Sequence, residues 1–394
     1  MVAVGAGAER PSVAAVGQKI SGGMHAPLVT ERLAGASAIF TPLLSRAHPY
    51  VVAMAPPHLL APTPAGLYCA AGDFYIDPLR PVPRALITHA HSDHARRGHG
   101  DVLATRETLD IMALRYGEDF CARRQVAAYG QSQRIGDVDV SFHPAGHVLG
   151  SAQVLVADER QRIVVSGDYK RASDPTCAAF EPVACDVFIT EATFGLPVFR
   201  HPDAGLEVAK LIASCALFPE RAHLVGAYAL GKAQRLMALI RQQGWERPIY
   251  IHGALEKITE YYAREGTDFG EIRKVSVAER SKLAGEIVIC TPASLQDIWS
   301  RKFPDPVAAL ASGWMRVRAR ARQRGVELPL VVSDHADWND LCATILETQC
   351  SQVWITHGEA DALVHWAGGI GLDARPLHLI GYGDEEEAAA EAQT

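Results

Sequence analysis

The chain has 394 residues, of which 48% are hydrophobic and 21% charged, so its composition excludes a protein that is disordered throughout. The formal net charge of −7 excludes a uniformly basic nucleic-acid binder but leaves room for local basic patches. No run approaches the roughly 18 apolar residues of a membrane-spanning helix, so we expect no membrane span. At roughly 100–200 residues per domain, this length favours two domains.

The two ends of the chain differ in composition from the rest. Residues 1–55 are rich in Ala, Gly and Val and lack the basic start and continuous apolar run of a secretory signal, so we expect a disordered leader. Residues 383–394 are acidic and Ala-rich, which is typical of a solvated tail. The eight cysteines are scattered without a Cys-x-x-Cys pair, which favours reduced cysteines in a cytoplasmic protein.

From about Leu59 onward, short apolar runs alternate with polar turns, which predicts β-strands. Each of the later strands is followed directly by a His, Asp or Glu. Polar side chains at strand ends are where an α/β scaffold places its chemistry. The predicted strands lie at 66–69, 74–76, 85–88, 138–142, 152–157, 163–166 and 186–190, with a helix over 106–116.

Residues 204–326 follow a different pattern, in which helices over 206–217 and 231–242 alternate with apolar strands. This alternation is typical of a parallel sheet. Strands then resume over 330–332 and 353–355. The simplest arrangement is an α/β metal domain in two parts, 56–203 and 327–382, interrupted by an inserted α/β domain at 204–326. The strands predicted in the insert lie at 223–226, 249–251 and 287–290.

The strongest functional signal is the run His-Ala-His-Ser-Asp-His directly after the strand 85–88. Alternation places His89 and His91 on the same side of an extended turn, so both can reach one ion. Asp93 and His94 point toward a second ion if the chain turns there. Imidazole and carboxylate groups suit zinc and similar divalent metals. Since each ion needs three or four ligands, others must come from distant strand ends, for which the candidates are His147, Asp168 and His357.

The remaining histidines lack this context. His143 lies close to His147 but inside an alternating strand, so a structural role is favoured for it. His99, His201, His223, His252, His365 and His378 are interpreted as ordinary histidines.

Taken together, these motifs resemble the metallo-β-lactamase superfamily, with His147 in a Gly-His loop and Asp168 in Ser-Gly-Asp. Glu191 in Glu-Ala-Thr-Phe-Gly, His335 in Ser-Asp-His-Ala-Asp and His357 in Thr-His-Gly-Glu are similar to motifs A, B and C of its β-CASP nucleases. The stretch from about 59 to 382 most resembles the bacterial ligase-associated DNA exonucleases. The runs that carry this closer resemblance are 66–69, 72–78, 311–315 and 333–338.

The resemblance implies an αββα sandwich with an inserted α/β β-CASP domain, and two zinc ions, with manganese as an alternative metal. It implies that Asp168 bridges the two ions and that His335 faces the scissile phosphate, oriented by Glu191. The implied ligands are His89, His91 and His147 for the first ion and Asp93, His94 and His357 for the second.

The chemistry of phosphodiester hydrolysis gives these residues their predicted roles. Paired metal ions can activate water and offset charge on the phosphate. His335 is the predicted general acid for the leaving oxygen, and Glu191 would favour its protonated form. Asp93 is also assigned a catalytic role, as a proton shuttle for the attacking water.

An arginine-rich segment, 314–325, is the predicted nucleic-acid contact. It has no interleaved acidic residues, which favours a surface that binds the phosphate backbone, with a solvated helix face as the alternative. Ser312 and Gly313 directly before it would let backbone amides approach a phosphate. The arginines predicted to take part are Arg316, Arg318 and Arg320.

The predicted function is a DNA exonuclease that trims ends in DNA repair. The resemblance alone implies an ATP-dependent DNA ligase and a helicase as partners. An RNA-processing nuclease remains an alternative, because a histidine at the position of His357 is usual in RNA-processing members of the family. A small-molecule metallo-hydrolase has no need of the insert or of His335. A scaffold that binds nucleic acid without cutting it is disfavoured by the intact ligand set.

Overall fold

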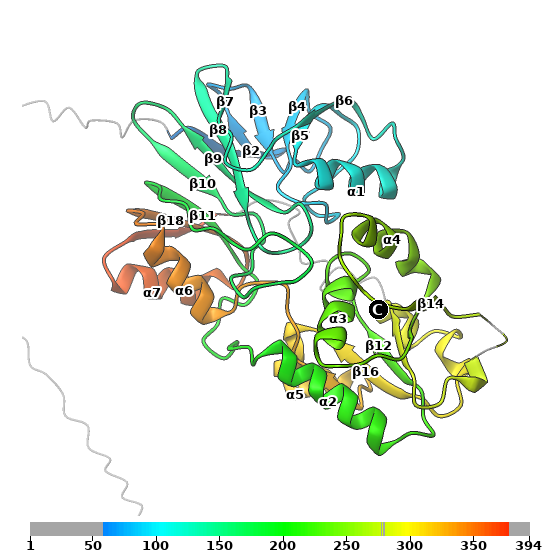
Figure 1. The fold of residues 1–394 in the computed structure, drawn as a ribbon. Helices are drawn as coiled ribbons and strands as arrows, with labels where there is room; N and C mark the ends of the chain where they lie inside the picture. Colours follow the sequence, from blue (N-terminus) through cyan, green and yellow to red (C-terminus); the bar gives the residue numbers. More distant parts are fainter. Residues whose placement is uncertain (1–57, 277, 279, 378–394) are drawn as a thin grey trace, which may run out of the picture. The chain divides into compact units, whose positions relative to one another are not determined.

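The structure is a computed structural model that describes residues 58–276, 278 and 280–377. The predictions for 1–55 and 383–394 therefore lie outside the described residues. Three sheets of six, seven and six strands, flanked by helices, make up the described part, which confirms the predicted α/β class (Figure 1). Among the described helices, none is both long enough and apolar enough to cross a membrane.

The first sheet follows the chain order, β1 to β6. Its first two pairings are antiparallel and the later ones parallel. Because β3 and β4 run parallel, their carboxyl ends share one edge, where Asp77 and the turn 89–94 follow them. The strands are β1 (Leu60–Thr63), β2 (Gly66–Cys69), β3 (Phe74–Ile76), β4 (Arg84–Leu86), β5 (His99–Ala104) and β6 (Cys121–Val126).

The second sheet has the order β19-β18-β11-β10-β9-β8-β7. Its strands β10, β11 and β18 are parallel neighbours, so the residues at their carboxyl ends, Asp168, Glu191 and His357, gather at one edge. The strands are β7 (Gln133–Ile135), β8 (Val138–Pro144), β9 (Ala152–Ala157), β10 (Arg162–Val165), β11 (Val187–Ala192), β18 (Gln352–Gly358) and β19 (Asp373–Pro376).

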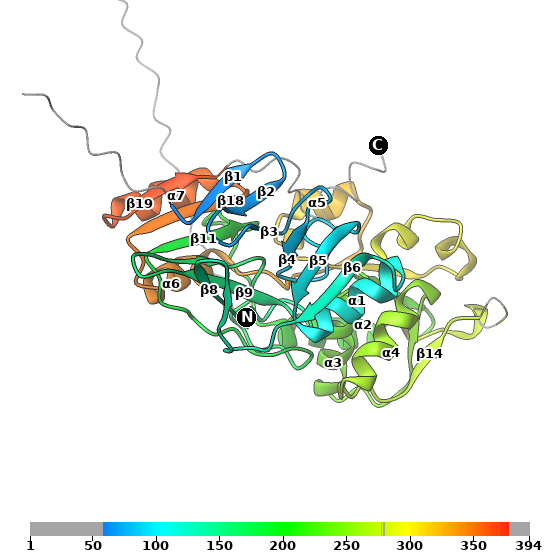
Figure 2. The same cartoon turned by 90° about the horizontal axis from the view of Figure 1, so that it is seen from above.

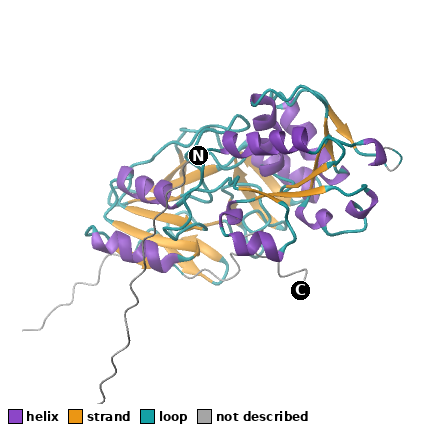
Figure 3. Ribbon diagram, turned by 90° about the horizontal axis from the view of Figure 1, so that it is seen from below, coloured by secondary structure: helices purple, strands orange, loops and turns teal. Residues whose placement is uncertain are grey.

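These two sheets share a core of alternating apolar side chains, among them Phe74, Leu86, Phe142, Val154 and Trp354. The other faces of both sheets are covered by helices, and Figure 3 shows that helices flank the strands rather than interleave with them. Helix α1 (Arg106–Tyr116) covers the first sheet, and α6 (Trp338–Glu347) and α7 (Ala360–Gly369) cover the second. Each of the two sheets is thus buried on both faces. This packing holds in place the strand ends that carry the polar residues.

The third sheet is wholly parallel, in the order β14-β13-β15-β12-β16-β17. The connection after β12 leads toward β14 and the connection after its neighbour β16 leads toward β17, so the loops after these two strands diverge. Open α/β sheets characteristically bind ligands at such a point. The strands are β12 (His223–Gly226), β13 (Ile249–Ile251), β14 (Ile272–Lys274), β15 (Ile287–Cys290), β16 (Val307–Ala311) and β17 (Leu328–Leu330).

Helices α2 (Ala204–Leu217), α3 (Lys232–Gln242) and α4 (Glu256–Arg264) accompany this third sheet. Helix α4 packs beside α1 (Figure 2). Between them the Tyr261 hydroxyl donates to Asp110 at 2.8 Å and Arg106 pairs with Glu265. The apolar cluster around α1 continues into α3 and α4, so the third sheet is packed against the first through shared buried side chains.

The strand predicted at 330–332 belongs to a different sheet from the one expected. The sequence pattern predicts that it belongs to the second part of the metal domain, but the observed strand, β17, pairs with β16 in the third sheet. A three-residue apolar strand fits the edge of any parallel sheet, so its sequence does not identify its partner.

Candidate metal centre

The turn after β4 brings its histidines together. The backbone amides of His94 and Ala95 both donate to the carbonyl of His91, at 3.2 and 2.7 Å, which closes the turn. The rings of His89 and His94 consequently lie 4.2 Å apart between centroids. The predicted run thus forms a compact group of donors.

The loop after β8 presents His147 to this turn. The Ser151 hydroxyl accepts from the amides of His147 and Val148, at 3.1 and 3.2 Å, and holds the loop closed. Gly146 has a φ of 72°, and a Cβ there would lie 2.3 Å from the carbonyl oxygen of Lys170. Only glycine fits this conformation and this close approach.

The donor atoms form two groups that share Asp168. In each group the imidazole nitrogens and the carboxylate oxygen lie within 4.8 Å of one another, as the ligands of one ion must. All of these side chains are buried except that of His357, which is half-buried. The first group is His89, His91, His147 and Asp168, and the second is His94, Asp168 and His357.

Hydrogen bonds fix which ring nitrogens face the first group. His91 Nε2 donates to the Leu230 carbonyl at 3.2 Å, and His147 Nδ1 donates to the Asp334 carbonyl at 2.8 Å, because a carbonyl can only accept. The opposite nitrogens, His91 Nδ1 and His147 Nε2, then face each other as lone pairs 3.0 Å apart. Two lone pairs at this distance repel unless a cation lies between them, so the arrangement fits a metal ion.

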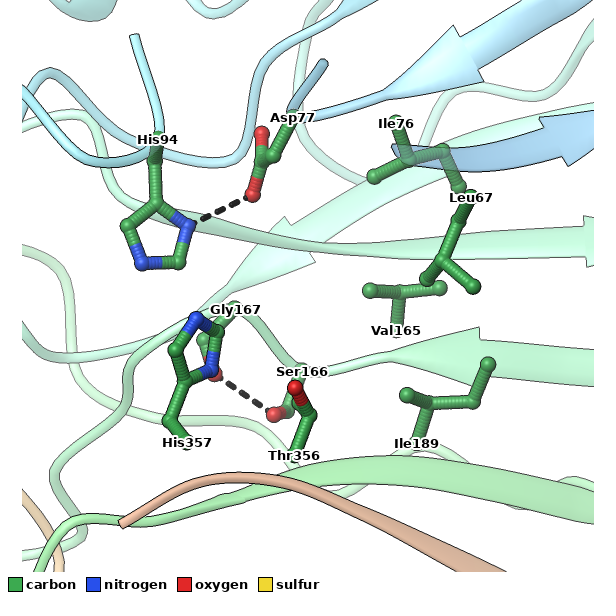
Figure 4. Close-up of a pocket in the computed structure, with 10 residues that line it drawn as sticks. All are labelled: Leu67, Ile76, Asp77, His94, Val165, Ser166, Gly167, Ile189, Thr356 and His357. Carbon is green, nitrogen blue, oxygen red and sulfur yellow. Dashed lines mark hydrogen bonds and ion pairs between the residues drawn. The ribbon is translucent and has the colours of Figure 1, made fainter. Parts of the chain in front are cut away.

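Asp77 organises the donors on the other side. Its carboxylate accepts from His94 Nδ1 at 2.7 Å (Figure 4). It also accepts from the Thr88 amide at 2.8 Å and from the Thr88 hydroxyl at 2.6 Å. The Thr88 hydroxyl in turn accepts from His89 Nδ1 at 3.1 Å. The Nε2 atoms of His89 and His94 are therefore left facing Asp168 Oδ2, at 3.4 and 3.5 Å.

The sequence interpretation did not assign Asp77 to the site. Its sequence signals are its place in the run 72–78 and an Asp-Pro pair directly after β3, and such a pair also has an ordinary turn-forming explanation. Asp77 and His357 both have left-handed backbone conformations, with φ values of 43° and 55°. Such conformations are unfavourable for residues other than glycine and cluster at functional sites.

Burial and nearby charges shift the pKa values of several donor side chains in directions that favour binding of a divalent cation. Burial, reinforced by His335 and His91, lowers the pKa of His147 to about 3, and burial together with His94 lowers the pKa of His357 to about 3. Burial opposes ionisation of Asp168, but His94 outweighs it and holds the Asp168 pKa well below its ordinary value. Neutral imidazoles at His147 and His357 beside an ionised Asp168 are the protonation states that metal ligation requires. At His94 burial is outweighed by Asp168 and Asp93, which raise its pKa well above the ordinary value, so a metal ion bound there would displace a proton.

Asp93 lies at the margin of these groups. Its carboxylate is buried, with Oδ2 at 3.7 Å from His94 Nε2, but it belongs to neither set of mutually close donor atoms. The other predicted ligands, by contrast, all fall within one set or the other.

His335 and Glu191 meet beside the first group. His335 Nδ1 donates to Glu191 Oε2 at 2.9 Å, and Glu191 Oε1 accepts from the Tyr169 amide at 2.8 Å. The ring centroids of His335 and His147 are 4.7 Å apart. Burial disfavours a charged His335, but the charge and hydrogen bond of Glu191 outweigh it and raise the His335 pKa well above its ordinary value. The pair thus keeps a protonated imidazole next to the metal pocket.

Three buried cations that the sequence interpretation did not identify hold the loop 333–335. Lys170 Nζ donates to the His335 carbonyl at 3.4 Å, and Arg235 donates to the Ser333 carbonyl at 2.7 Å. Lys232 Nζ lies 3.2 Å from Asp334 Oδ1. Each lies far from the loop 333–335 in the sequence, so its sequence neighbours do not predict this contact.

The arginine segment forms η5 (Gly313–Arg316) and α5 (Arg318–Gln323). Arg316 and Arg318 are exposed, and neither pairs with an acidic side chain in the described part of the chain. Arg320 instead lies over the ring of Trp314, 3.9 Å from its centroid.

Ser312 and Gly313 differ from their predicted role. Both are buried, and a Cβ on Gly313 would lie 2.3 Å from the ring of Phe194. The Trp314 amide donates to the Ser312 hydroxyl at 3.2 Å. Glycine is needed here for packing against an aromatic ring, so the prediction that these two residues offer amides to a phosphate is not supported.

No family model matches the chain. It is 29% identical over 317 residues to a protein named "Probable DNA ligase" from Opitutus terrae, a match covering 78% of this chain and 30% of that protein. It is 28% identical over 280 residues to a ribonuclease of Thermus thermophilus, covering 63% and 64%. It is 35% identical over 139 residues to the endoribonuclease ysh1 of Emericella nidulans, covering 34% and 15%.

The chain thus spans less than two thirds of the length of each of these relatives. A solved structure of a protein of unknown function from Enterococcus faecalis matches with a TM-score of 0.47 and 14% identity, over 69% of this chain and 74% of that one, a likeness too low to define the fold. The named relatives confirm the resemblance to the β-CASP nucleases of the metallo-β-lactamase superfamily. The buried His and Asp cluster fits the dinuclear metal site of that superfamily.

Proposed function

We propose that this relative of the β-CASP nucleases is a two-metal phosphodiesterase that hydrolyses nucleic acid. The observation that carries the proposal is the pair of buried donor groups sharing Asp168, next to the His335–Glu191 pair. The two facing sheets and the separate parallel sheet support a metallo-β-lactamase αββα sandwich with an inserted β-CASP domain.

The proposed metals are two zinc ions, with manganese as the alternative. Imidazole-rich sites with one carboxylate suit zinc, and the fixed outer nitrogens are typical of its ligands. His89, His91 and His147 would hold the first ion, His94 and His357 the second, and Asp168 would bridge them. Asp93 would complete the second site from its position beside His94.

When bound, the two ions would lower the pKa of a water molecule toward 7 and offset negative charge on the phosphate. The rest of the chemistry falls to the chain's own side chains. Glu191 fixes the ring of His335 through Nδ1, so Nε2 is the atom that can give a proton to the leaving oxygen. Asp93 would accept the proton of the attacking water.

DNA is the proposed substrate, and trimming of ends in DNA repair is the proposed role. The relative named as a DNA ligase supports this choice and suggests a ligase as a partner, with a helicase as a further candidate. RNA is the second candidate, since the relatives also include a ribonuclease and an endoribonuclease. The exposed Arg316 and Arg318 would contact the phosphate backbone. The scattered cysteines favour the cytoplasm.

Cleavage assays with end-labelled DNA and RNA of the same sequence, together with a metal count, test the proposal. We expect two metal ions per chain, faster cleavage of DNA, and loss of cleavage after chelation that added zinc or manganese restores. His335→Ala should retain both metals and cut about 10²–10⁴-fold more slowly. His365→Ala, which removes an exposed histidine on α7, is the matched control. Unchanged cleavage after complete metal removal would refute the proposal.

A further inference from the structure

The inserted segment, residues 204–326, carries most of the third sheet and contacts the ligands of the first metal position directly. The carbonyl of Leu230, in the loop after β12, accepts from His91 Nε2 at 3.2 Å. From α4, the buried Tyr262 hydroxyl accepts from the Leu149 amide at 3.1 Å, in the same loop as His147. One part of this segment therefore contacts the ligand His91, and another contacts the loop that carries the ligand His147.

The start of α3, with its N-cap residue Gly231, adds two more contacts. Gly231 packs so closely on Val148 that a Cβ at this position would lie 2.3 Å from its side chain. Lys232 is 2% exposed, and its ammonium lies 3.2 Å from Asp334, whose carbonyl accepts from His147. The ion pair therefore holds the residue that orients the His147 ring.

The ligands of the second metal position are held by residues of the first and second sheets. The outer nitrogen of His94 donates to Asp77, which ends β3 of the first sheet. His357 lies at the end of β18 of the second sheet. The partners that orient a metal-bound imidazole contribute strongly to affinity, so ions in the two positions should respond to different parts of the chain.

We infer that the inserted segment is a structural component of the first metal position: Leu230, Gly231, Lys232 and Tyr262 set the orientation of His91 and His147. These are positioning residues, because they act through the ligands and through Asp334. The inference rests on the proposed function only in that it requires metal ions at the two donor groups.

Tyr262→Phe tests the inference with a change of one oxygen atom. It leaves the Leu149 amide without its acceptor and should weaken metal binding at the first position by about 10–100-fold. Tyr261→Phe is the matched control, since it removes the neighbouring hydroxyl of α4, which bonds Asp110 instead. Metal affinities are measured by competition with a zinc chelator, without reference to activity.

Repeating Tyr262→Phe in two variants, each lacking one metal position, shows which position loses affinity. With the second position disabled by His94→Ala, Tyr262→Phe should weaken the remaining site by about 10–100-fold. With the first position disabled by His91→Ala, it should change nothing. An equal loss in both backgrounds, or no loss in either, would overturn the inference while leaving the metal centre intact. Absence of metal from the wild-type protein would instead remove the proposed function.

A second pair of variants removes charges rather than a hydroxyl. Lys232→Met combined with Asp334→Asn takes away both members of the buried pair, so that no lone buried charge remains. Lys274→Met with Glu256→Gln removes an exposed pair at 2.7 Å on the same segment as the control. Preferential loss of first-position affinity in the buried double variant alone agrees with the inference, and equal behaviour of the two double variants contradicts it.

Discussion

The two metal positions share Asp168 but are supported by different parts of the chain. At the first, the outer nitrogens of His91 and His147 are held by carbonyls of Leu230 and Asp334, 139 and 187 residues away along the chain. At the second, His94 is held by Asp77, only 17 residues away. Long-range contacts therefore hold His91 and His147 at the first position. A short-range contact within the first sheet holds His94 at the second, which His357 completes from the second sheet.

The two positions therefore depend on different amounts of tertiary structure. The Asp77–Thr88–His94 contacts need only β3 and β4, which pair directly in the first sheet. The first position needs the third sheet to be in place against the first.

Asp168→Ala should have the largest effect, because it removes the carboxylate common to both positions. Without this negative charge the facing imidazole nitrogens would bind the cations more weakly, so we expect loss of both metals. Cleavage should then fall roughly 10³-fold or more. Metal analysis and cleavage assays measure the two effects. Circular dichroism checks that the fold is retained. Full metal content in this variant would contradict the shared role of Asp168.

Asp77→Ala should act more strongly on the second position than on the first, because Asp77 bonds His94 directly and reaches His89 only through the Thr88 hydroxyl. It removes the acceptor of His94 Nδ1, so we expect about 10–100-fold weaker metal binding there. The buried Thr88 amide would also lose its partner, which costs about 1–3 kcal/mol of unfolding free energy.

Asp73→Ala is the control for this change. Asp73 shares the left-handed backbone conformation, with a φ of 48°, but its carboxylate accepts from the exposed Tyr68 hydroxyl. Zinc competition and thermal melts compare the two variants. The distinction between the positions fails if Asp77→Ala weakens both ions equally.

The double variant Arg316→Gln/Arg318→Gln should leave both metals in place. If each arginine contacts one phosphate, affinity for nucleic acid should fall and the logarithmic salt dependence of binding should flatten by about 2. Binding is measured over a range of salt concentrations with catalytically inactive protein. Arg273→Gln, which removes an exposed arginine paired with Glu271, is the control. An unchanged salt slope would exclude these arginines from the contact surface.

Arg320→Gln should have the smallest effect. Its guanidinium lies over Trp314, so the loss is a cation–π contact of about 0.5–1 kcal/mol in unfolding free energy. The salt dependence of nucleic-acid binding should change less than with Arg318→Gln. Denaturant unfolding and the same binding assay measure both. A larger binding defect than that of Arg318→Gln would place Arg320 on the substrate instead.

Local pattern was sufficient to predict most of the secondary structure. The helix expected at 106–116 is α1, and strands such as β2, β3 and β9 have the predicted bounds. These elements have clear periodicity and turn signals at their ends. The partner of β17 could not be predicted in this way, because pairing of a short apolar strand depends on which sheet edge remains free.

The sequence by itself determined which side chains can bind metal and that they follow strands, because both are properties of residue type and local pattern. Only the tertiary structure decided how these side chains are oriented. Backbone carbonyls such as those of Leu230 and Asp334 exist at every residue and carry no sequence signature, and Asp77 and Lys232 resemble ordinary turn and helix residues until the chain folds. Orientation of a ligand is set by what packs behind it, and that is a property of the whole fold.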